Sequence, residues 1–299
     1  MDPNAFTTPF QLTKSMRRDI YPAIDPKNSE LGAAGKVVLI TGATGGIGGE
    51  VARAWATAGA KGIVLVGGRN KHLLNEPAEA VKTISPSTQV FLHTADLTSE
   101  SEVAILFSQA VATFGAVDVV VHAAASAEGG VAGDAAPDVW FRGFEINVKG
   151  SYNIAHEYLK VNANGTLIFL GTLGASLTVP GMSSYSASKM AVLKLAEFLD
   201  AEKPDLRVFT VHPGIVRVTE TGRGASVDAL TPFAHDKGIQ TGGLSLYLAK
   251  PNANYLRGGF VSVNWDVAEM EAHKEEIVEK KLLKLAFLHA QLGTEGHPW

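Results

Sequence analysis

A tyrosine and a lysine stand four residues apart in Tyr185-Ser186-Ala187-Ser188-Lys189. In a helix, positions i and i+4 share one face, so the phenol and the ammonium can point into one site. A free tyrosine has a pKa near 10 and is a poor acid–base catalyst at neutral pH. A neighbouring cation stabilises the phenolate and lowers that pKa. The pair is therefore suited to proton transfer, although a Tyr–Lys pair on a helix can also be a plain surface contact.

Two polar residues upstream complete a candidate catalytic set. Thr172 directly follows a predicted buried strand, and its hydroxyl can polarise a carbonyl group held between it and Tyr185. It can equally bond its own backbone in a turn. Asn147 lies inside a predicted long helix, where asparagine is a mediocre helix former, so a packing or polar role is plausible.

A glycine-rich turn, Thr41 to Gly48, joins the first predicted strand to a predicted helix. Glycines permit a tight turn and a close approach of backbone to a pyrophosphate, and a helix N-terminus attracts that anion. The context predicts a dinucleotide site. The expected contacts are Gly42, Thr44, Gly46, Ile47 and Gly48.

The second predicted strand ends in Gly67-Gly68-Arg69-Asn70. A site for NAD(H) wants a carboxylate here to bind the ribose hydroxyls, and none is present. Arg69 can instead pair with a 2′-phosphate, with Asn70 beside it, or it can be a solvated residue that begins a helix. We therefore expect NADP(H) to be favoured over NAD(H).

The third predicted strand is followed by Asp96 and Leu97. Both residues are expected to lie against the cofactor, where the Asp96 carboxylate can accept a bond from the adenine amino group. The same carboxylate can instead cap the helix that begins near Ser99.

Short apolar runs alternate with helical patterns along most of the chain. The runs do not alternate with polar residues, which indicates strands buried on both faces of a parallel sheet. Strand–helix alternation predicts an α/β fold: a doubly wound, parallel seven-stranded sheet of Rossmann type in a single domain. The predicted strands are Lys36–Thr41, Gly62–Val66, Thr88–His93, Val117–His122, Gly165–Leu170, Leu206–His212 and Gly259–Val263. The predicted helices are 46–58, 70–84, 99–114, 138–161, 184–202 and 238–249.

The segments outside this alternation suggest three parts. Residues 1–34 hold four prolines and predict an irregular N-terminal arm, and residues 35–266 form the catalytic domain. Residues 214–236, with several glycines, predict a lid over a binding site. Residues 267–299 predict a C-terminal helical tail, with one helix from about Val267 to Leu292 that packs on its own domain, contacts a subunit or walls the site.

Composition excludes several classes of function. Lys plus Arg is 26 and Asp plus Glu is 30, a net charge of −4, so no basic surface for nucleic acid is indicated. The chain has no cysteine, its histidines show no metal-ligand spacing, and we expect no metal. No stretch approaches the roughly 18 apolar residues of a membrane helix. Without a secretory signal at the start, a cytoplasmic location is expected.

Together these motifs resemble those of the short-chain dehydrogenase/reductase family, in order and spacing from about Lys36 to Trp265. The N-terminal arm and the segment Asn264-Trp265-Asp266 resemble fungal members, many of them in secondary metabolism. The matching positions are the glycine turn, the pair Tyr185 and Lys189, the helix asparagine Asn147 and the Pro-Gly turn His212-Pro213-Gly214-Ile215-Val216.

The resemblance implies a role for each residue of the candidate set. Tyr185 is the acid when a ketone is reduced and the base when an alcohol is oxidised. Lys189 tunes Tyr185 and bonds the nicotinamide ribose. Thr172 stands where the family has serine, and Asn147 holds a water that links Lys189 to solvent.

The resemblance also implies contacts and assembly. Pro213 and Val216 flank the nicotinamide, and Ala123 lies beside the cofactor. The helices at 138–161 and 184–202 build a homodimer, and two such faces build a homotetramer.

Three departures from the family pattern bear on the chemistry. Thr172 replaces serine. His122-Ala123-Ala124-Ala125 replaces Asn-Asn-Ala-Gly, and we expect His122 to be a satisfied buried histidine rather than a replacement contact. Val218 stands where a threonine is expected, with Thr219 next.

The sequence therefore predicts an NADP(H)-dependent ketoreductase or alcohol dehydrogenase acting on a small, fairly apolar molecule. The departures leave open a non-redox isomerase or cyclase on the same scaffold, or a nucleotide-sensing binding protein. The apolar substrate is inferred from the lid residues Val216, Val218, Val227, Leu230 and Phe233.

Overall fold

The computed structural model describes residues 2–127, 130–217 and 230–286. They form one seven-stranded parallel sheet of order β3-β2-β1-β4-β5-β6-β7. Most of its strands are buried along their whole length, as strands covered on both faces must be. The predicted doubly wound sheet in a single domain is confirmed. The strands are β1 Val37–Thr41, β2 Gly62–Gly67, β3 Gln89–Thr94, β4 Val119–His122, β5 Thr166–Leu170, β6 Arg207–His212 and β7 Phe260–Ser262.

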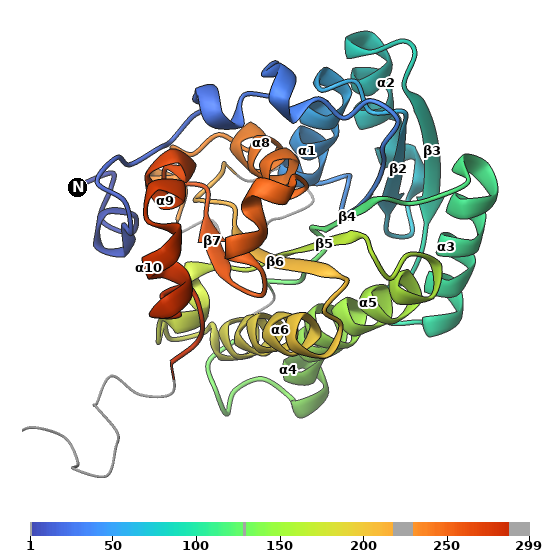
Figure 1. Cartoon of the computed structure of the whole chain (residues 1–299). Helices are drawn as coiled ribbons and strands as arrows, with labels where there is room; N and C mark the ends of the chain where they lie inside the picture. The colour runs from blue at the N-terminus through green and yellow to red at the C-terminus, as the bar shows by residue number, and fades with distance from the viewer. Residues whose placement is uncertain (1, 128–129, 218–229, 287–299) are drawn as a thin grey trace, which may run out of the picture.

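Helices cover both faces of the sheet (Figure 1). One apolar core lies between the sheet and α1, α2 and α8, and a second lies between the sheet and α3, α5 and α6. The helices of the described residues are α1 Gly46–Thr57, α2 Asn75–Ile84, α3 Glu100–Phe114, α4 Pro137–Phe144, α5 Gly150–Val161, α6 Ser183–Glu202, α8 Ile239–Leu248, α9 Val267–Ala272 and α10 Lys274–Glu279.

The strand order reverses between β1 and β4. These two strands pair in parallel, with Thr41 opposite His122 at their carboxyl ends. In a doubly wound sheet the helices that follow two such strands diverge to opposite faces and leave a crevice, which is where ligands bind. The fold therefore brings the glycine turn after β1 and the segment after β4 to one site.

The predicted helix over 138–161 is interrupted, and this is a correction. A π-helical turn, Glu145–Lys149, separates α4 from α5, and the buried Asn147 lies at its centre. A π-turn inserts one residue into the helical ladder, often at functional sites, and hydrophobic periodicity does not reveal it. The predicted helix over 70–84 likewise begins with a 3-10 turn, Lys71–Leu74, before α2.

The single C-terminal helix predicted from Val267 is wrong over the described residues. The chain leaves helical geometry at His273, between α9 and α10, and again at Lys281, whose φ is +52°. The segment that follows contacts the edge of the sheet instead of continuing a helix. Its Leu283 carbonyl accepts a hydrogen bond from Phe260 N of β7 at 3.0 Å. The predicted helix beyond residue 286 lies outside the described residues.

The N-terminal arm joins the core of the domain. Its 3-10 turns follow the side of the molecule that carries α8 and α9 (Figure 1). Tyr21 and Ile24 are buried, and the Tyr21 hydroxyl donates to Trp265 O and accepts from Val267 N. The arm therefore ties the segment after β7 to the face covered by α8.

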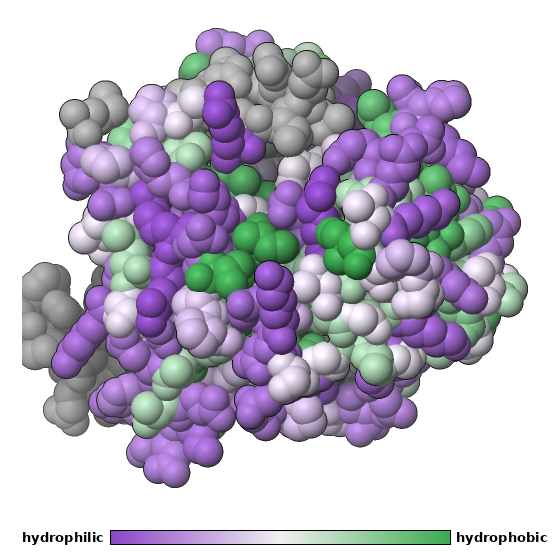
Figure 2. Space-filling model, turned by 90° about the horizontal axis from the view of Figure 1, so that it is seen from above, coloured by the Kyte–Doolittle hydropathy of each residue, from purple (hydrophilic) through white to green (hydrophobic). Residues whose placement is uncertain are grey.

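Seen from above, the surface is mainly hydrophilic, and hydrophobic residues form small separate patches (Figure 2). Among the described helices, none combines the length and the apolar character that crossing a membrane requires.

Candidate active site

The phenol of Tyr185 and the ammonium of Lys189 lie in the first half of α6, against the end of β5. Lys189 is buried, and its Nζ donates to the Leu170 carbonyl at 2.7 Å. The same Nζ lies 6.0 Å from the centre of the Tyr185 ring. The i, i+4 spacing thus places both groups at the carboxyl end of the sheet.

Burial shifts both groups toward their neutral forms. It lowers the pKa of the Lys189 ammonium to about 8 and raises the pKa of the Tyr185 phenol, although a hydrogen bond with Thr172 opposes the second shift. At pH 7 the phenol holds its proton and the ammonium is still largely charged. The lower tyrosine pKa expected from the neighbouring lysine is therefore not produced by the protein alone.

Thr172 bonds the backbone of its own turn, and its side chain also lies beside Tyr185. It follows β5 and caps a 3-10 turn, Leu173–Ser176, by accepting from Gly174 N at 3.0 Å. Its side chain also lies close enough to Tyr185 to oppose the rise in the pKa of that phenol. The turn fixes the hydroxyl next to the phenol, so one carbonyl oxygen can reach both groups.

Asn147 connects the segment after β4 to α6. Its Oδ1 accepts from Ser126 N at 2.8 Å, while its Nδ2 donates to Ser126 O and to Ser188 Oγ, both at 2.9 Å. The Asn147 carbonyl accepts from Ser151 Oγ at 2.5 Å. The residue thus braces the helix position next to Lys189, and its role in a water relay stays a prediction. No spacing pattern in the sequence indicated a role for these serines.

The glycine turn has the shape of a phosphate cradle. Gly42 has φ +65°, and a Cβ on it would lie 2.7 Å from Ala124 N. A Cβ on Gly48 would lie 2.3 Å from Gly42 O. Helix α1 begins without a side-chain cap and without an acidic residue in its first turn. The predicted residues Thr44, Gly46 and Ile47 thus belong to a helix N-terminus that fits a pyrophosphate.

Arg69 is exposed just beyond the end of β2. This position is compatible both with pairing to a 2′-phosphate and with a solvated residue at the start of a helix. Asn70 caps the following 3-10 turn by accepting from His72 N at 3.1 Å, so its side-chain oxygen is already engaged. These residues place one cation and no carboxylate at this strand end.

Asp96 and Leu97 lie at the neighbouring strand end. The Asp96 carboxylate accepts from both N and Oγ1 of Thr98, and these bonds, followed by the charge of Arg69, lower its pKa. Ser99 is the residue that caps α3, so the capping alternative for Asp96 is wrong. The Leu97 carbonyl accepts from Asn153 Nδ2 at 2.9 Å.

The turn expected to flank the nicotinamide follows β6. Pro213 is buried, Gly214 has φ +78°, and Val216 forms a bridge with Asp236. Of the lid residues, Leu230 is partly buried and Phe233 is buried. Val218, Thr219 and Val227 lie outside the described residues.

His122, beside Ala123 and at the end of β4, is only half satisfied. Its Nδ1 lies 2.8 Å from Thr41 Oγ1, which also accepts from Ala124 N. Which of these two groups donates to the other depends on the tautomer of the ring. The other ring nitrogen, Nε2, is buried and has no partner among the described residues. Burial, followed by the charge of Lys189, lowers the His122 pKa to about 3, so the ring is neutral. The expectation of a satisfied histidine is wrong for this nitrogen.

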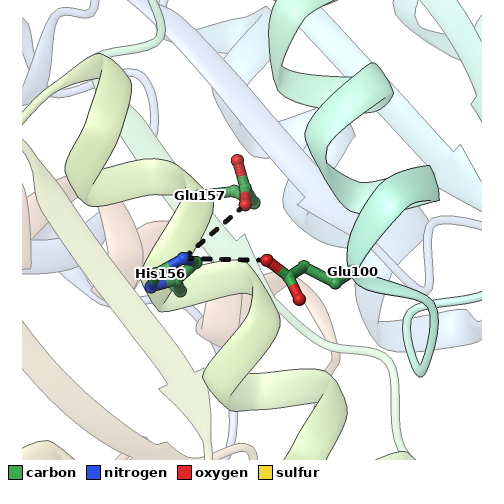
Figure 3. A group of neighbouring side chains, drawn as sticks. All are labelled: Glu100, His156 and Glu157. Atoms are coloured by element: carbon green, nitrogen blue, oxygen red, sulfur yellow. Dashed lines mark ion pairs between the residues drawn. The ribbon is translucent and has the colours of Figure 1, made fainter.

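One group of possible metal ligands occurs among the described residues, away from this site. Glu100 of α3 and His156 and Glu157 of α5 have ligand atoms within 4.8 Å of one another (Figure 3). The Glu157 carboxylate is already bound by Lys160 Nζ at 2.6 Å. The group is better described as a network of ion pairs, and we assign no metal to it.

The fold and the Tyr–Lys helix define a class of dinucleotide-binding enzymes, and comparison with known proteins identifies the family. The model of the short chain dehydrogenase family matches residues 36–228. The chain is 32% identical to the short chain dehydrogenase mpl6 of Monascus purpureus, over 92% of this chain and 96% of that protein. It is 31% identical to pigC of Monascus ruber, over 96% and 98%.

Solved structures agree with this assignment. A short-chain dehydrogenase/reductase from Serratia marcescens superposes with a TM-score of 0.70 at 26% identity, covering 77% of this chain and 96% of that one. The chain therefore belongs to the short-chain dehydrogenase/reductase family, whose members use nicotinamide cofactors. The predicted enzyme class and the likeness to fungal members are confirmed.

The buried ammonium leads to a stability prediction. The pKa of Lys189 falls from 10.5 in the unfolded chain to about 8 in the fold, so folding disfavours its charge. The cost of burying this charge is fully present below about pH 8. It decreases above that pH and is gone once the pH has risen through about 10.5. We expect Lys189→Met to be more stable than wild type at pH 7 by up to about 3 kcal/mol, less the lost bond to Leu170.

The measurement is urea unfolding of both proteins at pH 7 and at pH 10. The advantage of the variant must shrink at the higher pH. An equal difference at the two pH values would contradict the buried charge.

Proposed function

We propose that the protein is an NADP(H)-dependent oxidoreductase that interconverts a ketone and a secondary alcohol. The contact between Thr172 and Tyr185, with the Lys189 ammonium 6.0 Å from the same ring, carries the proposal. These groups surround one position with a proton donor, a second hydroxyl and a cation, which is what carbonyl reduction needs.

The reaction divides between hydride and proton. A bound nicotinamide supplies the hydride to the carbonyl carbon in reduction and accepts it in alcohol oxidation. The Thr172 and Tyr185 hydroxyls orient the carbonyl oxygen, and Tyr185 gives that oxygen its proton. The Lys189 ammonium stabilises the phenolate that remains. The raised pKa of the Tyr185 phenol favours the protonated acid before reduction begins.

A small pocket beside Thr172 supports an apolar substrate. It has a volume of about 170 Å³. An apolar cavity of about 150 Å³ holds a benzene ring, so this pocket, which Thr172 helps to line, can take a ring or a short alkyl arm of the substrate. Its apolar lining includes Leu173, Met190, Leu193, Phe260, Trp265 and Leu283.

The outer faces of α5 and α6 support the homodimer that family resemblance implies. Tyr152 on α5 and Phe198 on α6 expose more than half of their surface, and a subunit contact through these two helices would cover both side chains.

Removing the phenol hydroxyl tests the mechanism. With Tyr185→Phe we expect ketone-dependent NADPH oxidation to fall by about 10²–10⁴-fold, because the proton donor is lost. NADPH affinity, measured by fluorescence titration, should stay within a factor of about two. Substantial turnover by a folded Tyr185→Phe protein would refute the role of the phenol.

The charge of Arg69 tests the cofactor preference. Arg69→Ala removes the only cation at the end of β2 before Lys71, so we expect the Kd for NADPH to rise about tenfold. The Kd for NADH, which lacks the 2′-phosphate, provides the control and should not change. An equal effect on both cofactors, or none, would argue against NADP(H) selection by this residue.

Bulk added to the pocket tests the substrate side. Met190→Phe replaces a flexible thioether in the lining with a bulkier aromatic ring. We therefore expect KM for an aryl ketone such as acetophenone to rise severalfold. KM for a small ketone such as butanone should change little. If both substrates respond alike, the pocket does not hold the apolar part of the substrate.

A further inference from the structure

The N-terminal arm carries an arginine that reaches the far side of the candidate site. The Arg18 side chain has only 18% of its surface exposed, and it pairs with the fully buried carboxylate of Asp236, Nε to Oδ1, at 2.9 Å. A buried carboxylate is tolerated when a cation and hydrogen bonds satisfy it. Asn264 Nδ2 supplies a further bond to the same oxygen at 2.8 Å.

The other oxygen of Asp236 holds the turn after β6. Its Oδ2 accepts from Ile215 N at 2.6 Å, and Asp236 N donates back to the Ile215 carbonyl at 3.2 Å. A Cβ on Gly214 would lie 2.6 Å from the same oxygen. The turn Pro213–Val216 is therefore shaped around this one carboxylate.

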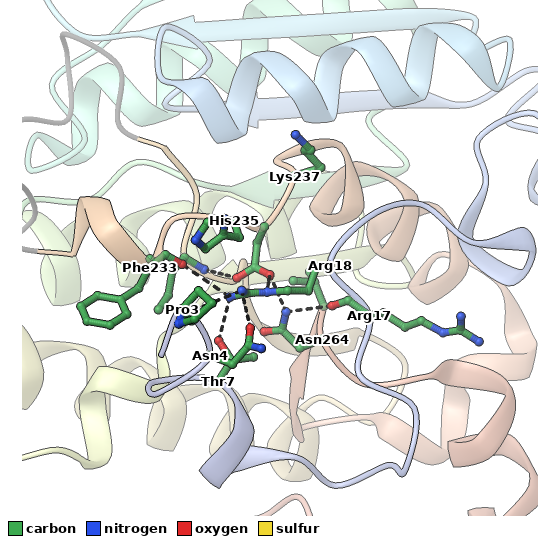
Figure 4. Close-up of polar contacts among 12 residues, drawn as sticks. Pro3, Asn4, Thr7, Arg17, Arg18, Phe233, His235, Lys237 and Asn264 are labelled. Carbon is green, nitrogen blue, oxygen red and sulfur yellow. Dashed lines mark hydrogen bonds and ion pairs between the residues drawn. The ribbon is translucent and has the colours of Figure 1, made fainter. Parts of the chain in front are cut away.

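The rest of the Arg18 guanidinium fixes the arm itself. Nη1 donates to Asn4 Oδ1 at 2.7 Å and Nη2 donates to Thr7 Oγ1 at 3.0 Å (Figure 4). Nη2 also lies 3.4 Å from the Phe233 carbonyl. The Phe6 ring packs edge-on against the Phe233 ring at 4.7 Å. One planar side chain thus joins the start of the arm directly to the later end of the segment between β6 and α8 and, through Asp236, to the turn at its beginning.

We infer that Arg18 is a positioning residue for the cofactor: through Asp236 it holds the Pro213–Val216 turn in the conformation that receives the nicotinamide. The inference rests on the proposed function, because the nicotinamide contact of this turn is part of that proposal. Arg18 itself touches no reacting atom. Its guanidinium holds the Asp236 carboxylate in place, so the Ile215 amide has a fixed, charged acceptor. Without the arginine, the buried carboxylate loses its cation and is free to turn toward water, which weakens the bond from Ile215.

The neighbouring arginine provides a matched control. Arg17 also comes from the arm and also forms an ion pair, but its partner is Asp266 at 2.6 Å. Asp266 caps α9 by accepting from Ala268 N and Glu269 N, and among the described residues it has no hydrogen bond to the Pro213–Val216 turn. Arg17→Met therefore removes an arm ion pair without removing the support of Ile215.

The test has two measurements on Arg18→Met and Arg17→Met. Hydrogen exchange of the cofactor-free proteins should show the Ile215 amide exchanging at least about tenfold faster in Arg18→Met and unchanged in Arg17→Met. The Kd for NADPH should rise about tenfold in Arg18→Met only, because the turn is no longer held in place. With NADPH saturating, kcat and the KM for the ketone should stay within about twofold, and Arg18→Lys should recover part of the affinity.

Normal Ile215 exchange in a folded Arg18→Met protein would overturn the inference. If that variant does not fold, the double variant Asn4→Ala/Thr7→Val loosens the opposite end of the guanidinium and is judged by the same exchange rate. Because exchange is measured without cofactor, it is independent of the proposed function. If the wild-type protein binds no NADPH, the proposed function is wrong. The link from Arg18 to Ile215 is then still tested by the exchange rate of the Ile215 amide.

Discussion

The burial of one ammonium group is the constraint on which the site depends. Lys189 is taken out of water at the end of β5, where its ammonium donates a hydrogen bond to the Leu170 carbonyl. Among the described residues no carboxylate pairs with this ammonium, so its positive charge is available to stabilise a negative charge that forms beside it. In the reaction that we propose, the Tyr185 phenolate carries that negative charge. Burial of this charge lowers the stability of the fold. The same burial strengthens the interaction of the ammonium with a nearby negative charge, because little water screens it.

The parallel sheet makes this burial possible. Its strands end at one edge, so segments far apart in sequence meet there: the glycine turn after β1, Ser126 after β4 and Thr172 after β5. Asn147 joins two of these segments through Ser126 and Ser188, because the π-turn places its side chain between the strand end and α6. The supporting bonds are mostly between side chains and backbone, which fixes positions without adding charge near Lys189.

The sequence predicted those parts that periodicity and local spacing determine. Unbroken apolar runs indicated the strands, and the i, i+4 pair and the glycine turn fixed two ends of the site. Local patterns could not show the π-turn at Asn147, the break at His273 or the unpartnered Nε2 of His122, because each depends on tertiary contacts. For residues 1–34 the sequence predicted only an irregular arm, because the segment has no period. The order of the arm comes from side chains such as Tyr21 and Arg18 that bond partners more than 200 residues away.

The arm and the buried lysine have opposite effects on the stability of the fold. An uncompensated charge at Lys189 lowers stability, whereas the Arg18–Asp236 pair is compensated by Asn264 and by the Ile215 amide. Because Asp236 bonds both the turn and the arm, the order of the turn depends on the order of the arm. A domain that consisted of the sheet and its helices alone would leave the Asp236 carboxylate buried without a cation. The arm is therefore part of the same folded unit as the sheet, although its sequence predicted only an irregular segment outside the domain.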